Sequence, residues 1–301
     1  MTFRQFLRIV ELRTKLVSAS SLLLGTLYAA FASGRFSPAR FALMAAAGLA
    51  VDMGTTAFNS FYDYLRGVDN PALNREPDKV LVHEGVPPAE ALLAGLGLYL
   101  LAGLLGGALA LLTDPWLAPV GAACMAVGFL YNGGPHPISR TPFGELFAGG
   151  FLGSVLFLIA CFVQAGSLPA GAAAASLPSL LLVASILSVN NACDLEADRA
   201  AGRRTLAVLL GPRPAEALVY GLGAAAWLSA AGLAFTGILP RLSLAALGPA
   251  LVYALAVYRG MHRRGYSLAS KGASMLGVLK VFAAYSLAAA AGLAAGLLGR
   301  T

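Results

Sequence analysis

Residues 59–69 read Asn-Ser-Phe-Tyr-Asp-Tyr-Leu-Arg-Gly-Val-Asp and close a long apolar run. Asn59 and Asp63 are four residues apart, so in a helix their side chains lie on one face, one turn apart. Asp69 follows Gly67, where we expect the helix to end. Carboxylates beside hydrocarbon are costly, and crowded carboxylates raise each other's pKa unless a cation compensates them. The stretch therefore predicts a cation site.

A second acidic stretch, residues 190–199, also closes an apolar run and reads Asn-Asn-Ala-Cys-Asp-Leu-Glu-Ala-Asp-Arg. It repeats the Asn-x-x-x-Asp spacing in Asn190 and Asp194, and Asp198 follows four residues later. A single stretch of this kind could be a solvated helix end. Two matched stretches favour the interpretation that they are halves of one divalent-cation site.

The residue types in both stretches indicate which cation the site would hold. Mg²⁺ prefers carboxylate and amide oxygens, whereas a zinc site would need His or Cys ligands. The predicted metal ligands are Asn59, Asp63, Asp69, Asp194 and Asp198, and Asn190 is a further oxygen donor.

Basic residues accompany the same carboxylates. Arg66 lies within the first stretch and Lys79 follows it, while Arg203 and Arg204 follow the second. Metal ions together with Arg and Lys donors commonly bind a diphosphate and stabilise it as a leaving group. Arg66, Lys79 and Arg203 are therefore candidate diphosphate ligands. The alternative, that the basic residues only anchor the chain at the membrane interface, applies better to Arg213, Arg259, Arg263 and Arg264.

Composition places the chain in a membrane. Of its 301 residues, 58% are hydrophobic and 12% are charged, and its mean hydropathy is +0.75. Ordinary soluble domains are roughly 25% charged. No shift in composition marks a separate soluble domain, so we expect one all-α transmembrane domain over residues 1–301. The net charge of +7 reflects basic residues beside apolar runs, which favours membrane topology over nucleic-acid binding.

Cys124, Cys161 and Cys193 lack paired spacing and are interpreted as core residues.

Apolar runs predict about nine membrane spans and a retained first helix. Alternating the connections places sixteen basic residues on the N-terminal side of the membrane and four on the other. By the positive-inside rule, the N-terminus and both acidic stretches face the cytoplasm. The predicted spans are 16–32, 41–62, 89–112, 115–131, 144–165, 171–193, 215–236, 242–258 and 276–298.

A third polar stretch, residues 131–137, reads Tyr-Asn-Gly-Gly-Pro-His-Pro and is followed by Gly144-Glu145-Leu146-Phe147. Gly and Pro favour a tight turn, which could hold Tyr131 and Asn132 at the cytoplasmic mouth of the helix bundle. His136 lies between two prolines, and we expect an exposed turn residue rather than a general base.

Taken together, these motifs resemble the UbiA superfamily of intramembrane prenyltransferases. The resemblance rests on Asn59, Asp63, Gly67 and Asp69, on the Asp194-x-x-x-Asp198 pair and on the number of spans. Three details are most similar to the MenA branch, which prenylates 1,4-dihydroxy-2-naphthoate. These details are the Gly-x-Asp ending of the first motif, the 131–137 turn with its following Gly-Glu-x-Phe, and the run 190–206.

The resemblance implies a helical bundle around a central cavity with a cytoplasmic cap, in a prokaryotic plasma membrane. Mg²⁺ and a polyprenyl diphosphate would lie between the two aspartate motifs, and the second substrate would be an aromatic acceptor. Prenyl transfer with loss of CO₂ would complete a step of menaquinone synthesis. The metal would be held by Asn59, Asp63, Asp69, Asp194 and Asp198, and the diphosphate approached by Arg13, Arg66, Lys79, Tyr131, Asn132, Asn190 and Arg203.

Two departures from the family pattern concern the acceptor. Ser60 stands where a second acidic residue is common, and Asp52 and Thr56 stand where amides are common. Asp52 could line the acceptor cavity, or it could be neutral or water-bonded. Lys280, inside the last span, has no predicted role. Alternative acceptors are 4-hydroxybenzoate, haem or a lipid, and the rival class is a cation-coupled transporter. We infer no obligatory protein partner.

Overall fold

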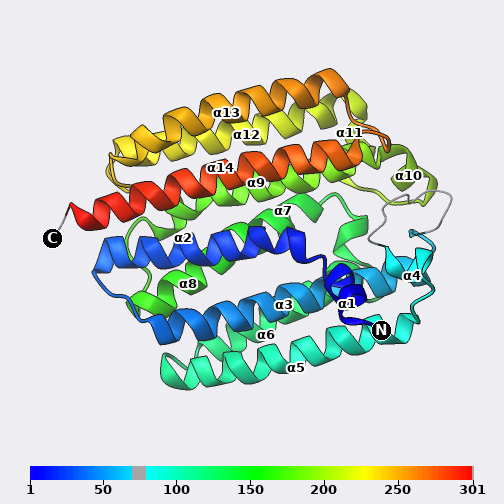
Figure 1. The fold of residues 1–301 in the computed structure, drawn as a ribbon, viewed down its shortest axis with the longest axis horizontal. Helices are drawn as coiled ribbons and strands as arrows, with labels where there is room; N and C mark the ends of the chain where they lie inside the picture. Colours follow the sequence, from blue (N-terminus) through cyan, green and yellow to red (C-terminus); the bar gives the residue numbers. More distant parts are fainter. Residues whose placement is uncertain (70–78, 300–301) are drawn as a thin grey trace. The chain divides into compact units, whose positions relative to one another are not determined.

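The structure is a computed structural model that describes residues 1–69 and 79–299, and these ranges are folded as helices joined by turns (Figure 1). Eight helical segments within them are long and apolar enough to cross a membrane, and α6 (Leu117–Asn132) is a shorter apolar helix. The chain is therefore an integral membrane protein, and the predicted all-α class with about nine spans is confirmed. Arg75, one of the sixteen basic residues assigned to the N-terminal side of the membrane, lies outside the described residues.

The eight candidate spans combine long helices with two composite segments. They are Leu12–Ser33 (η1, Leu12–Lys15, and α2, Leu16–Ser33), α3 (Pro38–Leu65), α5 (Pro88–Leu112), Gly144–Ala165 (α7, Gly144–Ala148; η3, Gly149–Val155; α8, Leu156–Ala165), α9 (Ala172–Cys193), α12 (Pro212–Phe235), α13 (Ser243–Arg264) and α14 (Lys271–Leu298). Shorter elements lie outside these spans: α1 (Phe3–Ile9), α4 (Val80–His83), η2 (Ile138–Arg140), α10 (Leu195–Ala200) and α11 (Leu206–Leu210).

The last two helices extend beyond the spans predicted from hydropathy. Helix α13 continues to Arg264 instead of ending at residue 258, and α14 begins at Lys271 instead of residue 276. Hydropathy marks the hydrocarbon-spanning part of a helix, whereas the helix itself continues into the headgroup region. Basic residues in the last turn of α13 favour that continuation, because they interact well with the negative end of the helix dipole.

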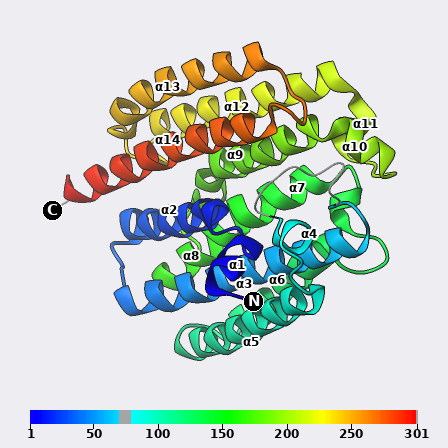
Figure 2. The same ribbon diagram turned by 45° about the vertical axis from the view of Figure 1, so that its right-hand side comes forward.

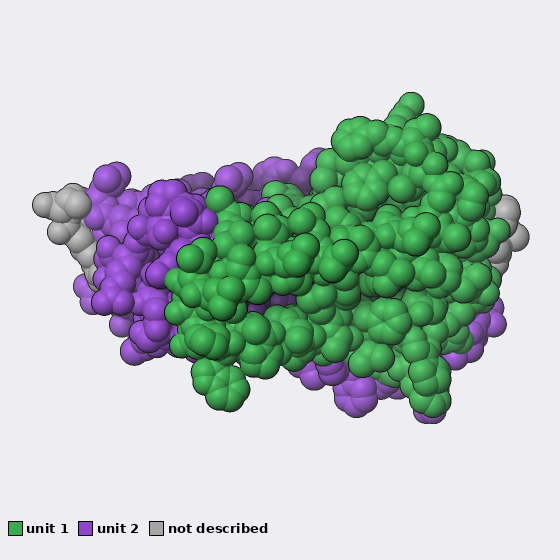
Figure 3. All heavy atoms as spheres, turned by 90° about the horizontal axis from the view of Figure 1, so that it is seen from below, with its two compact units in different colours: residues 1–16, 42–141 green, residues 17–41, 142–301 purple. Residues whose placement is uncertain are grey.

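The chain divides into two compact units, shown in green and purple in Figure 3. The first unit comprises Met1–Leu16 and Ala42–Thr141, and the second comprises Val17–Phe41 and Pro142–Thr301. Each unit contains one of the two aspartate motifs.

In the first unit, aromatic side chains join α3 to α5 and α6. The Phe58 ring lies 4.9 Å from the Tyr99 ring and 5.3 Å from the Phe129 ring, both edge-on. Tyr99 also shares a 2.8 Å hydrogen bond with Thr55 and donates to the backbone oxygen of Met125. Edge-to-face aromatic pairs add to the burial energy of the rings. This packing fixes the helix that carries the first aspartate motif.

The N-terminal helix α1 is tied to the segment that follows residue 79. A capping box between Thr2 and Gln5 starts the helix. Gln5 and Arg8 both donate hydrogen bonds to Glu84, just after α4, and these bonds lower the pKa of the Glu84 carboxyl. Ile9 is buried with Val80 and other apolar residues in a small core. Helix α1 therefore stabilises the chain around Lys79.

In the second unit, α9 packs against α12 and α14, and α13 runs beside α14 (Figures 1 and 2). Large side chains such as Tyr28, Tyr285 and Phe282 are fully buried in its core. Trp227 meets Tyr285 edge-on at 6.0 Å. The cysteines Cys161 and Cys193 are buried, as predicted for core residues, whereas Cys124 in the first unit is half-buried.

The π-helix η3 approaches α9 through glycine. A Cβ atom on Gly153 would lie 2.5 Å from the Cα and 2.6 Å from the backbone nitrogen of Leu180. We expect Gly153→Ala to lower the free energy of unfolding by about 1–3 kcal/mol, because backbone must shift to make room. Gly150→Ala is the matched control, since its Cβ would meet no atom within 4 Å. Thermal unfolding of both purified variants in detergent tests this; equal stability of the two variants would contradict it.

Candidate active site

The first aspartate motif lies at the C-terminal end of α3. Asn59 and Asp63 are both helical, and the chain leaves the helix after Leu65 through Gly67, whose φ is 67°. The backbone amides of Val68 and Asp69 then donate to the Asp63 carbonyl at 3.0 and 3.1 Å. The predicted helix end is confirmed, and the turn folds Asp69 back toward the helix, where it is buried.

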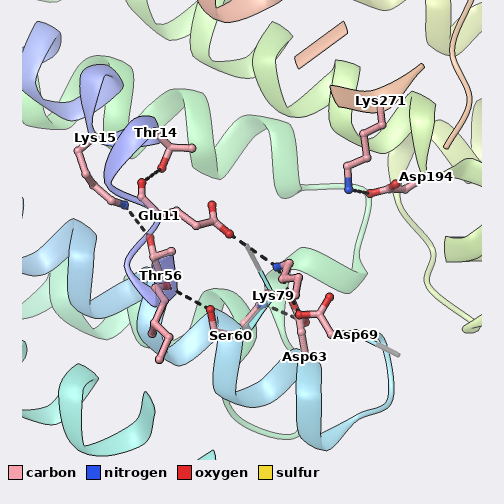
Figure 4. A network of polar contacts seen from close by, with 12 residues as sticks. Glu11, Thr14, Lys15, Thr56, Ser60, Asp63, Asp69, Lys79, Asp194 and Lys271 are labelled. Carbon is pink, nitrogen blue, oxygen red and sulfur yellow. Dashed lines mark hydrogen bonds and ion pairs between the residues drawn. The ribbon is translucent and has the colours of Figure 1, made fainter. Parts of the chain in front are cut away.

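Lys79 binds the acidic groups around this turn. Its Nζ lies 3.3 Å from Asp69 Oδ2 and 3.6 Å from Glu11 Oε1 (Figure 4). Ser60, where the family pattern has an acidic residue, instead donates a hydrogen bond to the backbone oxygen of Ile9. Lys79 therefore lies beside Asp69, a carboxylate of the first motif, as its position after that motif predicted.

The turn after α6 also contacts the first motif. Asn132 Nδ2 donates to Asp63 Oδ1 at 3.1 Å. The Arg66 guanidinium donates to the backbone oxygens of Asn132 and Gly134, and it lies 4.9 Å from the centre of the Tyr62 ring. Arg66 thus holds the predicted turn against α3 through bonds to the turn backbone. His136 is exposed, as expected for a turn residue.

The second motif is built where α9 ends. Asp194 follows α9, its amide donating to the Asn190 carbonyl at 3.0 Å, and Lys271 Nζ lies 2.8 Å from Asp194 Oδ2. Asp198, on α10, lies 3.0 Å from Arg203 Nη1 and accepts a 3.4 Å hydrogen bond from Thr205. Each aspartate of the second motif therefore has its own basic partner.

Opposing effects act on the Asp198 carboxyl, and burial, the largest of them, leaves its pKa raised. Burial raises the pKa of the Asp198 carboxyl, and the charge of Asp194 raises it further. Arg203, Thr205 and Lys271 act in the opposite direction. A bound cation would favour the ionised form of such a carboxyl, because it compensates both burial and the neighbouring negative charge.

The donor set fits a hard cation. Within residues 1–69 and 79–299, no three His, Cys, Asp or Glu side chains lie close enough together to hold a metal ion. However, Oδ1 of Asn59 and Oδ1 of Asn132 are both buried, and no donor in the described part of the chain reaches either oxygen. Both residues neighbour Asp63, Asn59 one helical turn before it on α3 and Asn132 through its Nδ2 bond, and amide oxygens are ligands that Mg²⁺ accepts. These residues therefore fit the predicted ion by chemistry.

The other predicted site residues are placed in their separate units. Arg13 lies in η1 and Tyr131 near the end of α6, both in the first unit, while Asn190 lies in α9 of the second. Their roles stay predictions. The structure therefore brings Asn132 and Lys79 to carboxylates of the first motif and Arg203 to the second, whereas Arg66 binds the backbone of the turn after α6.

Sequence reasoning missed two basic partners of acidic residues. Lys15 Nζ lies 2.7 Å from Thr56 Oγ1 (Figure 4). It also lies 2.7 Å from Asp52 Oδ1, so Asp52 is ion-paired and not simply water-bonded. The possibility that Asp52 lines the acceptor cavity stays a prediction. Lys271 is the second missed partner. Its only sequence signal is a lysine in the connection before the last predicted span, a position that bears on membrane topology alone.

Glu145 is a buried carboxyl that contacts the second motif in the structure, although it lies 46 residues before Asn191 in the sequence. Asn191 Nδ2 donates to its Oε1 at 2.9 Å, while its Oε2 has no partner in the described part of the chain. The Gly-Glu-x-Phe segment was noted only for its resemblance to the MenA branch. The hydrogen bond between Asn191 and Glu145 joins that segment to the second motif.

Comparison with known proteins agrees with these motifs. Residues 19–275 match the model of the UbiA prenyltransferase family. The chain is 38% identical to a 1,4-dihydroxy-2-naphthoate octaprenyltransferase of Bacillus subtilis, over 72% of this chain and 69% of the relative. An enzyme of the same name from Mycobacterium tuberculosis is 34% identical over 61% of this chain and 62% of the relative.

Solved structures agree on the fold. A UbiA homolog from Archaeoglobus fulgidus, solved bound to GPP and Mg²⁺, superposes with a TM-score of 0.67 at 18% sequence identity, covering 96% of this chain and 99% of that one. The resemblance inferred from the aspartate motifs is confirmed. The chain belongs to the UbiA prenyltransferase family.

Proposed function

We propose that this chain transfers a polyprenyl group from polyprenyl diphosphate to 1,4-dihydroxy-2-naphthoate, in a Mg²⁺-dependent reaction that releases CO₂ and diphosphate. The observation that carries the proposal is the repeated arrangement of aspartates with basic partners, one in each unit. The acceptor is suggested by the names of the relatives from B. subtilis and M. tuberculosis. The product would be the demethylmenaquinol of menaquinone synthesis.

In this proposal the acidic residues of both motifs bind Mg²⁺, and the basic residues bind the diphosphate. When bound, Mg²⁺ would neutralise charge on the diphosphate as it leaves. Its proposed ligands are Asn59, Asp63, Asp69, Asp194 and Asp198. Lys79 and Arg203 bind diphosphate oxygens, and Arg66 contributes through the 132–134 turn that it holds. The further proposed substrate contacts are Arg13, Tyr131, Asn132 and Asn190.

The bond changes follow from the two substrates. The bond between the allylic carbon and the diphosphate oxygen breaks, and its electron pair leaves with the diphosphate. The ring carbon that carries the acceptor's carboxylate then forms a bond to the allylic carbon. Loss of the carboxylate as CO₂ returns an electron pair to the ring and restores aromaticity. Aromatic residues near the first motif, such as Tyr62, would stabilise the allylic cation through their π faces.

The apolar helices account for the location of such a reaction. The polyprenyl substrate and the product are lipids, so the hydrophobic spans of one domain over residues 1–301 would accommodate the isoprenoid tail. We propose a prokaryotic plasma membrane with the N-terminus and both motifs on the cytoplasmic side, because the basic connections lie on that side by the positive-inside rule.

The proposal predicts a product that requires both the metal and the correct acceptor. We expect purified protein in detergent or nanodiscs, supplied with Mg²⁺, labelled farnesyl diphosphate and 1,4-dihydroxy-2-naphthoate, to form a prenylated and decarboxylated product by mass spectrometry. EDTA should abolish the product and excess Mg²⁺ should restore it. A parallel reaction with 4-hydroxybenzoate should give no comparable product.

Two other outcomes would contradict this proposal in different ways. In the first, the protein binds the prenyl diphosphate in the presence of Mg²⁺ but forms no product from 1,4-dihydroxy-2-naphthoate. This result would support the proposed prenyl donor and show that the proposed acceptor is wrong. A folded protein that binds no prenyl diphosphate would reject prenyl transfer altogether and favour transport.

A further inference from the structure

Lys271 lies beside the second aspartate motif, although nothing in the motif itself points to it. It is the first residue of α14, and its Nζ is 2.8 Å from Asp194 Oδ2. The two side chains are 18% and 14% exposed. We propose that Lys271 is a diphosphate-binding residue, which pairs with Asp194 in the absence of substrate and with diphosphate oxygens in its presence. The inference rests on the proposed prenyl-transfer function.

Helix stability does not explain a lysine at this position. The first turn of a helix carries a partial positive charge, so a cation there is unfavourable. Helix α13 shows the favourable arrangement, with Arg263 and Arg264 in its last turn. Ordering a long lysine side chain also costs conformational entropy. A residue that breaks a local rule in this way is expected at a functional site.

The connection before α14 holds Lys271 in a defined place. Helix α13 ends at Gly265, whose φ is 67°. Ser270 Oγ donates to the Gly265 carbonyl at 2.9 Å and accepts from the amide of Ser267 at 2.9 Å. The Ser274 amide donates to the Ser270 carbonyl at 2.9 Å, which starts the helix. The serines therefore fix the backbone from which Lys271 reaches Asp194.

The charge of Lys271 extends over the whole second motif. It contacts Asp194 directly, and it is among the groups that favour the ionised form of Asp198. Arg203 makes the direct contact with Asp198 at 3.0 Å. Lys271 and Arg203 therefore each contact one of the two carboxylates. If the carboxylates bind a metal ion, these two cations become available to bind diphosphate oxygens.

Substrate binding would change the partner of Lys271. A metal ion bound by Asp194 would compete with the Lys271 ammonium, which already contacts Oδ2 of this carboxylate. If the carboxylate binds the metal, the partly buried ammonium loses its counter-charge, which is costly unless another anion replaces it. A diphosphate supplies that anion, and lysine binds phosphate as a point charge. The second motif would thus exchange one ion pair for another.

The first unit contains the same arrangement. Lys79 Nζ lies 3.3 Å from Asp69 Oδ2, so each motif has a lysine on one of its aspartates. Lys79 could be assigned to the diphosphate from sequence because it follows the first motif by ten residues. Lys271 is separated from Asp194 by 77 residues, so only the fold connects them.

Binding measurements can isolate the role of Lys271 from turnover. The probe is farnesyl thiolodiphosphate, a poorly reactive analogue, titrated by calorimetry at saturating Mg²⁺ without acceptor. We expect Lys271→Met to weaken binding about 10- to 100-fold, as for loss of one charged hydrogen bond. Lys271→Arg should retain most of the affinity. Lys280→Met is the matched control in the same helix, because Lys280 is exposed, and it should bind as wild type does.

The same variants give a kinetic test. Lys271→Met should raise KM for the prenyl diphosphate and leave KM for the acceptor unchanged. If Lys271 only neutralises Asp194, the variant should bind the analogue as tightly as wild type at saturating Mg²⁺, and that result would overturn the inference.

A labelling experiment on the unaltered protein covers the case in which Lys271→Met does not fold. Amine acetylation followed by mass spectrometry should show Lys271 more reactive with Mg²⁺ alone, then protected when the analogue is added. Lys271 reactivity that does not respond to the analogue, in protein that binds it, would reject the inference and keep the proposed function. Wild-type protein that binds no analogue would reject both.

Discussion

Asp63→Asn is expected to reduce the rate of prenyl transfer by roughly 10³-fold, which is the scale for losing one preorganised charge-stabilising group. The change removes the carboxylate charge from the first motif and preserves its shape. Asn132 Nδ2 donates to Asp63 Oδ1 at 3.1 Å, and the amide oxygen of asparagine can accept the same bond. The Arg66 contacts to the turn do not involve Asp63 and should persist. The loss should therefore be one of chemistry and not of folding.

The measurement is turnover of farnesyl diphosphate with 1,4-dihydroxy-2-naphthoate, together with thermal unfolding of the same preparation. Asp114→Asn is the matched control: Asp114 lies in the same unit but outside both motifs, where it caps the amide of Trp116. The control should keep wild-type activity. An Asp63→Asn variant with undiminished turnover would remove the first motif from the proposed metal site.

The local part of the site could be predicted from sequence because helical spacing is regular. Residues at i and i+4 share a helix face, so Asn59 with Asp63 and Asn190 with Asp194 could be paired before the fold was known. Gly67 marked the end of α3 for an equally local reason, since glycine adopts the left-handed conformation at a helix end at little cost.

Contacts between site residues that are far apart in the sequence could not be predicted, because they depend on how the helices pack. Lys15 and Asp52 are 37 residues apart, and Lys271 and Asp194 are 77 apart. No spacing rule connects residues at such separations. The short helices α4, α10 and α11 also escaped prediction, because four to six residues in a polar connection give too few turns for a periodic pattern.

Arg66 illustrates why residue type alone is insufficient. Its position within the first motif predicted a direct contact with diphosphate. In the fold its guanidinium donates to two carbonyl oxygens of the turn after α6, because the planar fork of arginine matches acceptors that lie side by side. The turn carries Asn132, which donates to Asp63. Arg66 therefore influences the first motif through the turn, a connection that requires the packing of α6 against α3.

Lys15→Met is expected to cause the largest loss of stability, because it breaks a buried ion pair. Lys15 is 5% exposed, and its Nζ lies 2.7 Å from Asp52 Oδ1 within a membrane-spanning helix. Removing one partner of such a pair costs about 3–5 kcal/mol, since the remaining carboxylate stays buried after losing the ammonium that faced it. The free energy of unfolding in detergent should fall by that amount, whereas exposed Lys280→Met should change it little.

The double variant Lys15→Met/Asp52→Leu tests whether Lys15→Met loses stability through the unpaired charge of Asp52 or through lost packing of the Lys15 side chain. Replacing both partners by apolar groups of similar size leaves no uncompensated charge, and such replacements are often neutral or stabilising. Thr56 keeps a partner in either variant, because its hydroxyl also donates to the Asp52 backbone oxygen at 3.0 Å. We therefore expect the double variant to recover most of the stability that Lys15→Met loses. If it is as unstable as the single variant, the charge of Asp52 is not the cause, and the methylene packing of Lys15 would account for the loss instead.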